Sequence, residues 1–192
     1  MTLLILGLIL FLGLHSLRIF ADSWRTAQIA RLGEKPWKGL YSLASIVGFV
    51  LLIEGFGRAR AATVVLWSPP FWTHYVAALL TLLAFVLVVA AYVPGTRIKS
   101  WLHHPMVLGV KVWAFAHLIS NGTLADVVLF GSFLAWAIAD FASSRRRDRV
   151  AGTVYPAGTA GKDAVAVVVG VVAWAVFAFW LHGWWIGVKP LG

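Results

Sequence analysis

The chain alternates between long apolar segments and shorter polar stretches. A helix needs about 20 mostly apolar residues to cross the hydrocarbon core of a bilayer, and six segments approach or exceed that length. They predict an all-α protein: a single domain over residues 1–192, folded as an integral membrane bundle of six transmembrane helices. The first segment has no basic start and no A-x-A sequence after it, so we expect a retained span rather than a signal peptide. The predicted spans are residues 2–21, 40–57, 71–93, 105–120, 124–142 and 163–188.

Basic residues are distributed unevenly over the loops between these spans. Eleven of the 16 Lys and Arg lie in the first, third and fifth loops, and three lie on the other side. Because basic loops stay in the cytoplasm, we predict that the N- and C-termini are outside, in the periplasm. The fourth span is short and contains Lys111. Without this span, however, the basic fifth loop would lie on the opposite side of the membrane from the first and third loops, so the charge distribution supports six spans. We expect this loop, residues 143–162, to be basic and then Gly/Ala-rich, cytoplasmic and flexible.

Composition agrees with a membrane protein and excludes several other classes. Hydrophobic residues make up 61% of the sequence and charged residues 12%, which is too apolar for a soluble globular domain or a disordered chain. The net charge of +9 indicates contact with anionic lipid at the cytoplasmic leaflet of the bilayer, and not with nucleic acid. There is no Cys, which excludes thiolate catalysis, disulfides, iron–sulfur clusters and thiolate zinc sites. Histidine is therefore the main candidate metal ligand.

Two of the six histidines lie deep within predicted spans, where an ionisable side chain is costly and indicates function. At about 1.5 Å per residue, His15 lies roughly 20 Å below the outer edge of the membrane and His117 roughly 12 Å below it. We expect these two imidazoles to meet near the middle of the membrane. The other four are expected to be interfacial or solvated, with a shared metal or quinol site as the alternative for the outer pair. They are His103 and His104 on the inner side, and His74 and His182 on the outer side.

The chemistry of two buried imidazoles leaves three interpretations open. A zinc site takes three or four protein ligands, whereas two histidines complete the axial ligation of a haem iron. The alternatives are histidines packed and hydrogen-bonded within the bundle, and a proton or ion path. Haem binding would need cations for the propionates, and Arg18 and Lys111 lie on the cytoplasmic side of the histidines. It would also need an aromatic pocket, and the rings at suitable depth are Phe11, Trp113, Phe115 and Trp136.

Two sequence motifs resemble those of a known family. The first is GLHS at residues 13–16, and the second is HPMVLGVKVWAFAHL at residues 104–118, followed by Asn121 and Gly122. Over essentially its whole length the sequence resembles the NnrU family of bacterial membrane proteins, which is named for a link to nitrite and nitric oxide reduction in denitrifying bacteria. The resemblance implies a multi-pass protein of the bacterial inner membrane. NnrU proteins are similar to the plant 15-cis-zeta-carotene isomerases, which use haem b in a redox-dependent cis-to-trans isomerisation.

The resemblance also implies a set of site residues. The two haem-ligand histidines of those isomerases match His15 and His117, which implies haem b with bis-histidine ligation. The isomerases have a Cys, implicated in ligand switching, three residues before the second histidine, where this chain has Ala114. Around the two histidines we expect the cofactor to contact Arg18, Lys111, Trp113 and Asn121.

Three functions follow as expectations. The first is haem-dependent cis–trans isomerisation of a hydrophobic polyene. The second is a non-catalytic haem protein that carries electrons or binds nitric oxide. The third is a small anion transporter without haem, with a path lined by His15, Arg18 and Lys111. The expected partners are the lipid bilayer and either a polyene substrate or an electron donor.

Overall fold

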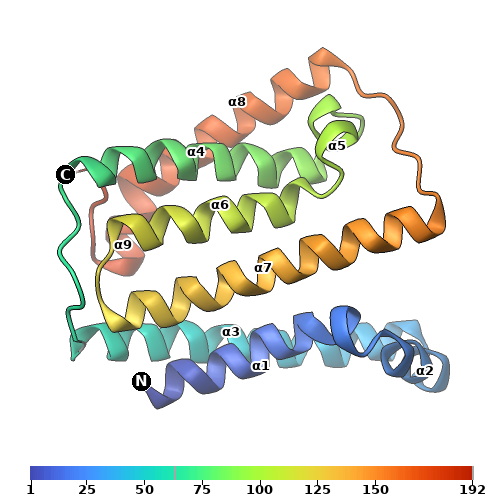
Figure 1. Ribbon diagram of the computed structural model, residues 1–192, viewed down its shortest axis with the longest axis horizontal. Coiled ribbons are helices and arrows are strands. Elements are labelled where there is room, and N and C mark those ends of the chain that lie inside the picture. The colour runs from blue at the N-terminus through green and yellow to red at the C-terminus, as the bar shows by residue number, and fades with distance from the viewer. Residues whose placement is uncertain (63, 192) are drawn as a thin grey trace.

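The computed structural model describes residues 1–62 and 64–191, and its regular secondary structure is all helical, as predicted. Six long segments run side by side and two short helices cross one end of the bundle (Figure 1). The last long segment contains one π-helical turn, η1. In chain order the elements are α1 (Thr2–Phe20), α2 (Asp22–Leu32), α3 (Glu34–Ala61), α4 (Trp72–Tyr92), α5 (Arg97–Leu102), α6 (Pro105–Ser120), α7 (Leu124–Ala151), α8 (Ala160–Val176), η1 (Phe177–Leu181) and α9 (His182–Ile186).

The chain reverses direction between successive long segments, so that its connections gather at two ends. Helix α1 packs against α3, α7 contacts both α1 and α6, and α4 lies between α6 and α8. Both termini and the α6–α7 turn lie at one end, which we name the termini end (Figure 1). Helices α2 and α5 and the segment 152–159 lie at the other, which we name the basic end because the Arg-rich stretch 145–149 of α7 reaches it.

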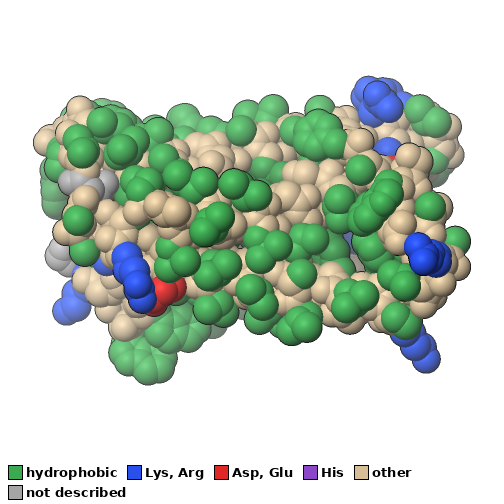
Figure 2. Space-filling view, turned by 90° about the horizontal axis from the view of Figure 1, so that it is seen from below, with side chains coloured by type: hydrophobic (Ala, Val, Ile, Leu, Met, Phe, Trp, Pro, Cys, Tyr) green, Lys and Arg blue, Asp and Glu red, His purple; other side chains and the backbone are tan. Residues whose placement is uncertain are grey.

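Five helical segments within the described residues are long and apolar enough to cross a membrane. They are Thr2–Phe20, Glu34–Ala61, Trp72–Tyr92, Leu124–Ala151 and Ala160–Ile186, whereas α6, the fourth predicted span, is a shorter apolar helix of 16 residues. Figure 2 shows the outer surface along one face: apolar side chains cover its middle, and Lys and Arg are confined to the two ends. The chain is therefore built as a multi-pass membrane protein.

Glycine allows α1 and α3 to pack backbone against backbone. A Cβ atom on Gly7 would lie 2.6 Å from the Leu52 nitrogen, and one on Gly48 would lie 2.9 Å from the Phe11 nitrogen. Small residues at such contacts are typical of helix pairs in lipid, where close packing rather than hydrophobic burial holds helices together. Since the two helices are antiparallel, this register places residues 44 and 45 of α3 opposite His15.

The loop predicted over residues 143–162 is shorter in the structure, because α7 occupies its first part and α8 begins at Ala160, which leaves residues 152–159 between the two helices. Helix α7 continues to Ala151 and ends at Gly152 in the left-handed conformation, so the expectation of a flexible linker over 143–151 is wrong. The helix extends because hydrogen bonds along its surface stabilise it without any apolar run: Arg147 donates to Ser143 and Ser144, both at 2.7 Å. The first and third predicted loops likewise contain helices α2 and α5.

Candidate functional site

His15 lies near the basic end of α1, with its imidazole held by its own helix. Its Nδ1 donates a hydrogen bond of 2.7 Å to the carbonyl of Phe11, one turn earlier. A carbonyl oxygen can only accept, so the proton is on Nδ1 and the lone pair is on Nε2, the tautomer that ligates a metal through Nε2. The ring is surrounded by those of Phe11, Tyr41 and Trp136, with centroids at 4.3, 5.5 and 6.1 Å.

His117 lies near the termini end of α6 and has the same local arrangement. Its Nδ1 donates to the Trp113 carbonyl at 2.8 Å, which again leaves the lone pair on Nε2. The Phe130 ring of α7 stacks on the imidazole with centroids 4.4 Å apart. Asn121, which was predicted to contact a cofactor, ends α6 by donating from its side-chain amide to the His117 carbonyl at 2.9 Å.

The two imidazoles lean toward the same level of the bundle. A helical side chain points back toward the N-terminus of its helix, and α1 and α6 run in opposite directions. Both rings therefore lean toward the middle, each over the residue four positions earlier. Those residues, Phe11 and Trp113, contact one ring of α7, Phe133, at 6.0 and 5.4 Å. Phe133 of α7 therefore lies between the residues on which the two imidazoles lean.

Helix α7 also provides a scale for the separation of the histidines. Phe130 contacts His117 and Trp136 contacts His15. These α7 residues are six positions apart, which corresponds to about 9 Å along the helix axis. The depths of His15 and His117 calculated from the sequence differ by roughly 8 Å, which agrees with the spacing on α7. The distance between the two imidazoles along the bundle axis is smaller than this, because their side chains lean toward each other.

The aromatic surroundings differ in part from those expected. Phe11, Trp113 and Trp136 surround the histidines, but Phe115 is 49% exposed on the outside of the bundle, so its assignment to the pocket is wrong. Sequence reasoning missed Phe130 and Phe133 of α7. The sequence did contain a signal for them: Phe130, Phe133 and Ala137 are three and four positions apart, and residues at this spacing share one face of a helix.

The predicted cations lie in different surroundings. Arg18 is exposed one turn beyond His15, and its backbone carbonyl accepts a hydrogen bond of 3.3 Å from Arg147. The Lys111 ammonium lies over the Phe141 ring, 4.6 Å from its centroid. Lys111 is thus occupied at the α6–α7 contact near the basic end, an arrangement that does not support an anion path shared with His15.

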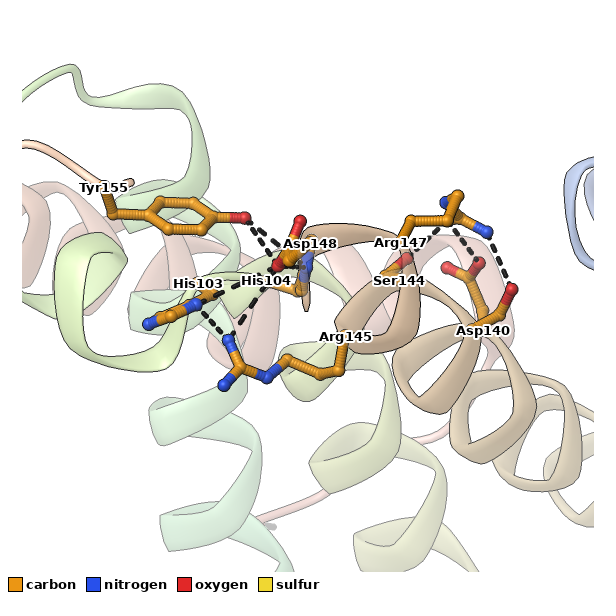
Figure 3. Close-up of polar contacts among 9 residues, drawn as sticks. His103, His104, Asp140, Ser144, Arg145, Arg147, Asp148 and Tyr155 are labelled. Carbon is orange, nitrogen blue, oxygen red and sulfur yellow. Dashed lines mark hydrogen bonds and ion pairs between the residues drawn. The ribbon is translucent and has the colours of Figure 1, made fainter. Parts of the chain in front are cut away.

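A carboxylate near His15 escaped the sequence reasoning. Asp140 of α7 interacts electrostatically with Arg147, His104, Arg18 and His15. Its Oδ1 lies 3.9 Å from the Arg147 Nη2, as Figure 3 shows. Asp140 is two residues before the predicted end of its span, and nothing in the sequence pattern links it to the histidine.

A second polar cluster joins α7 to the α5–α6 turn at the basic end (Figure 3). The His104 Nε2 lies 2.7 Å from the Asp148 Oδ2, and the Tyr155 hydroxyl donates to the same oxygen at 3.0 Å. Arg145 contacts His103 and lies 3.8 Å from Asp148. Burial raises the pKa of Tyr155, and its bond to Asp148 raises it further. His103 and His104 therefore belong to a partly buried network, not to a solvated loop.

The outer histidines have separate partners. His74 packs edge-on against Phe71 at 5.8 Å, and the His182 Nδ1 donates to the Val188 carbonyl at 2.7 Å. In the described part of the chain, no group of three or more His, Asp or Glu is placed to hold a metal ion. A metal centre with three or more protein ligands therefore has no support among these residues.

The residue types around the two histidines are those that a haem would need. Two Nε2 lone pairs, from His15 and His117, supply an axial ligand set, and aromatic rings form apolar walls. In addition, the Trp136 Nε1 is buried without a hydrogen-bond partner among the described residues. An unpaired buried donor beside His15 is the kind of group that a bound molecule would satisfy.

Comparison with known proteins gives one match. No curated protein and no solved structure matches the chain. A family model does match it: the model described as NnrU protein covers residues 3–190. Because the match extends over nearly the whole sequence, the chain belongs to the NnrU family.

Proposed function

We propose that this NnrU-family protein holds haem b in the bacterial inner membrane, with His15 and His117 as the two axial ligands. One observation carries the proposal. Each imidazole is fixed at Nδ1 by the carbonyl four residues earlier, and the residues bearing these carbonyls contact the same side chain, Phe133. Two ligands of the correct tautomer thus lean toward one level, from helices that run in opposite directions.

The chain's own residues would orient the ligands and keep the site apolar. The bond from Nδ1 fixes the tautomer and ring plane of each histidine and makes Nε2 a stronger ligand. Asn121 holds the carbonyl of His117 and so secures the last turn of α6. When bound, haem supplies one-electron redox chemistry at its iron, tuned by axial ligation and by the polarity around it.

We further propose that all six long segments cross the membrane, with both termini in the periplasm. Helix α6 is about 24 Å long, somewhat short of a hydrocarbon core of about 30 Å. Hydrogen bonds extend the ordered structure beyond its end: Leu66 donates to the Gly122 carbonyl at 2.7 Å, and Leu124 to the Val64 carbonyl at 2.9 Å. The basic end then faces the cytoplasm, as the charge distribution requires.

The absence of Cys from the sequence makes topology directly testable. Ala157→Cys places a single thiol at the basic end and Lys189→Cys places one near the C-terminus. A membrane-impermeant maleimide added to intact spheroplasts should label the second variant and not the first, whereas lysed cells should show both labelled. Labelling of Ala157→Cys in intact spheroplasts would show that the orientation is reversed or the number of spans is odd.

The candidate reaction is cis–trans isomerisation of a hydrophobic polyene, by analogy with the plant isomerases that NnrU proteins resemble. A specific observation favours a second candidate, an electron-transfer haem protein. The position of the isomerase Cys is occupied by Ala114, which is fully buried against the rest of the bundle, and both histidines are held in the same way. Expression in a bacterium that lacks zeta-carotene isomerisation separates the two: restored conversion supports the isomerase, and its absence in a haem-loaded protein supports electron transfer.

Ligation itself is tested by the absorption spectrum of protein purified in detergent after haem-replete expression. We expect a Soret band and the sharp reduced bands of a low-spin, six-coordinate haem. His15→Ala and His117→Ala should each abolish this spectrum or convert it to a five-coordinate form. His74→Ala, at the membrane rim, is the matched control and should leave it intact. No Soret band in the wild-type protein, or a spectrum lost only in His74→Ala, would overturn the proposal.

A further inference from the structure

The indole N–H of Trp136 is a buried donor without an acceptor. Its Nε1 is shielded from solvent and has no hydrogen-bond partner among the described residues. By contrast, Trp174 donates from its Nε1 to the Thr81 hydroxyl at 3.0 Å. Buried Trp N–H groups normally find a partner. A bound molecule with an acceptor at this place would satisfy Trp136.

The position of Trp136 defines where that acceptor lies. Its ring packs at right angles to His15, with centroids 6.1 Å apart. It is three residues beyond Phe133, about 4.5 Å nearer to the basic end. The phenol of Tyr41 approaches His15 from α3 with ring centroids 5.5 Å apart, and Arg18 follows His15 by less than one turn. Trp136 and Tyr41 offer N–H and O–H donors beside the imidazole, and Arg18 offers a cation on its basic side, which suits an oxygen acceptor, and best an anionic one.

Among the described residues, Asp140 is the acidic group shown to interact with His15, and it lies one turn beyond Trp136 on the same helix. It does not compete as the acceptor, since Trp136 has no partner and the carboxylate faces Arg147, whose Nη2 lies 3.9 Å from Oδ1. The guanidinium groups of Arg147 and Arg18 both act on Asp140. Their positive charges offset its negative charge, so that a second carboxylate can enter without meeting an unpaired anion.

We infer that Trp136 donates its Nε1 hydrogen to a propionate carboxylate of the haem, with the Tyr41 hydroxyl as a neighbouring donor. The inference rests on the proposed function and assigns an orientation to it: the propionate edge of the macrocycle faces the cytoplasmic side. It also gives Trp136 a role that its ring alone does not require, because Phe would form the same apolar wall.

The test compares Trp136→Phe with the wild-type protein, each loaded either with haem b or with its dimethyl ester, in which the propionates carry no charge. Haem release to apomyoglobin is followed in the Soret region. Loss of one charge-assisted hydrogen bond corresponds to roughly tenfold faster release. We expect this acceleration with haem b and a smaller one with the dimethyl ester, whose carbonyl oxygen is a weaker acceptor than a carboxylate. Trp174→Phe, which removes an indole far from His15, is the matched control and should behave as wild type.

The possible outcomes are distinct. Equal release of haem b from Trp136→Phe and wild type would overturn the inference and leave bis-histidine ligation standing. Equal acceleration with both haems would also overturn it, because the indole would then act by packing alone. A wild-type protein that binds no haem would overturn both the inference and the proposed function. A shift of the propionate bending mode in the resonance Raman spectrum of Trp136→Phe provides an independent readout.

Discussion

Gly48 of α3 packs against the backbone of α1 at Phe11, whose carbonyl holds His15. A Cβ atom at this position would lie 2.9 Å from the Phe11 nitrogen and 3.1 Å from its Cα. Ordinary van der Waals contact begins at 3.4 Å, so the two helices would have to separate by about half an ångström. The obstructing atoms are backbone, and no rotation of a side chain can relieve the clash. We therefore expect Gly48→Ala to destabilise the α1–α3 pair.

The magnitude follows from two opposing terms. Overpacking a close contact costs about 1–3 kcal/mol. Replacing Gly by Ala within a helix stabilises it by about 0.8–1.0 kcal/mol. Gly57→Ala on the same helix is the matched control, because a Cβ there meets nothing within 4 Å. The propensity term cancels between the two variants, so Gly48→Ala should be less stable than Gly57→Ala by about 1–3 kcal/mol.

The assay is unfolding by sodium dodecyl sulfate in dodecyl maltoside micelles, followed by far-ultraviolet circular dichroism. Both variants and the wild-type protein are titrated under the same conditions, and the free energies of unfolding are compared at one detergent composition. Equal stability of Gly48→Ala and Gly57→Ala would refute the reasoning, since it would mean that α1 and α3 do not approach each other at Phe11.

Three further predictions concern other contacts. Thr123→Ala removes the side chain that accepts from the Asp126 nitrogen at the start of α7 and should lower the free energy of unfolding by about 1 kcal/mol in the same titration; an unchanged midpoint would contradict the cap. Lys111→Met removes the ammonium from the facing phenyl ring and should cost about 0.5–2 kcal/mol, again by detergent titration. Burial and the bond to Asp148 raise the pKa of Tyr155, so the folded protein favours the neutral phenol. The stability that the neutral phenol contributes is lost as the pH rises through this raised pKa. The difference in ultraviolet absorbance between the wild-type protein and Tyr155→Phe should therefore show that Tyr155 ionises above pH 10. In Asp148→Asn the same ionisation should occur at a lower pH.

The sequence and the structure agree on features that depend on local composition. Hydropathy located all the long segments, because each depends on a run of apolar residues. The histidines within those segments were found for the same reason: an ionisable residue stands out in an apolar run wherever its helix packs. Ends of helices were less predictable. Residues 143–151 continue α7 through Ser, Arg and Asp side chains, which carry no apolar signal.

Which residues face each other was decided only by the tertiary structure. In a membrane, lipid-facing and buried helix faces are both apolar, so the hydrophobic pattern does not distinguish them. Phe115 and Phe133 look alike in the sequence, yet one faces outward and the other joins the surroundings of both histidines. The partner of Lys111 and the unpaired N–H of Trp136 were equally invisible.

The sequence alone therefore determined the helical class, the apolar segments, the resemblance to NnrU proteins and the two intramembrane histidines. The tertiary structure decided that Phe11 and Trp113 meet at Phe133, and that Trp136 stands beside His15 with a free donor. The physical reason is that apolar character is a property of each residue by itself. Rotation and register depend on the close approach of backbones, such as that of Gly48 to Phe11, and only the packed bundle establishes it.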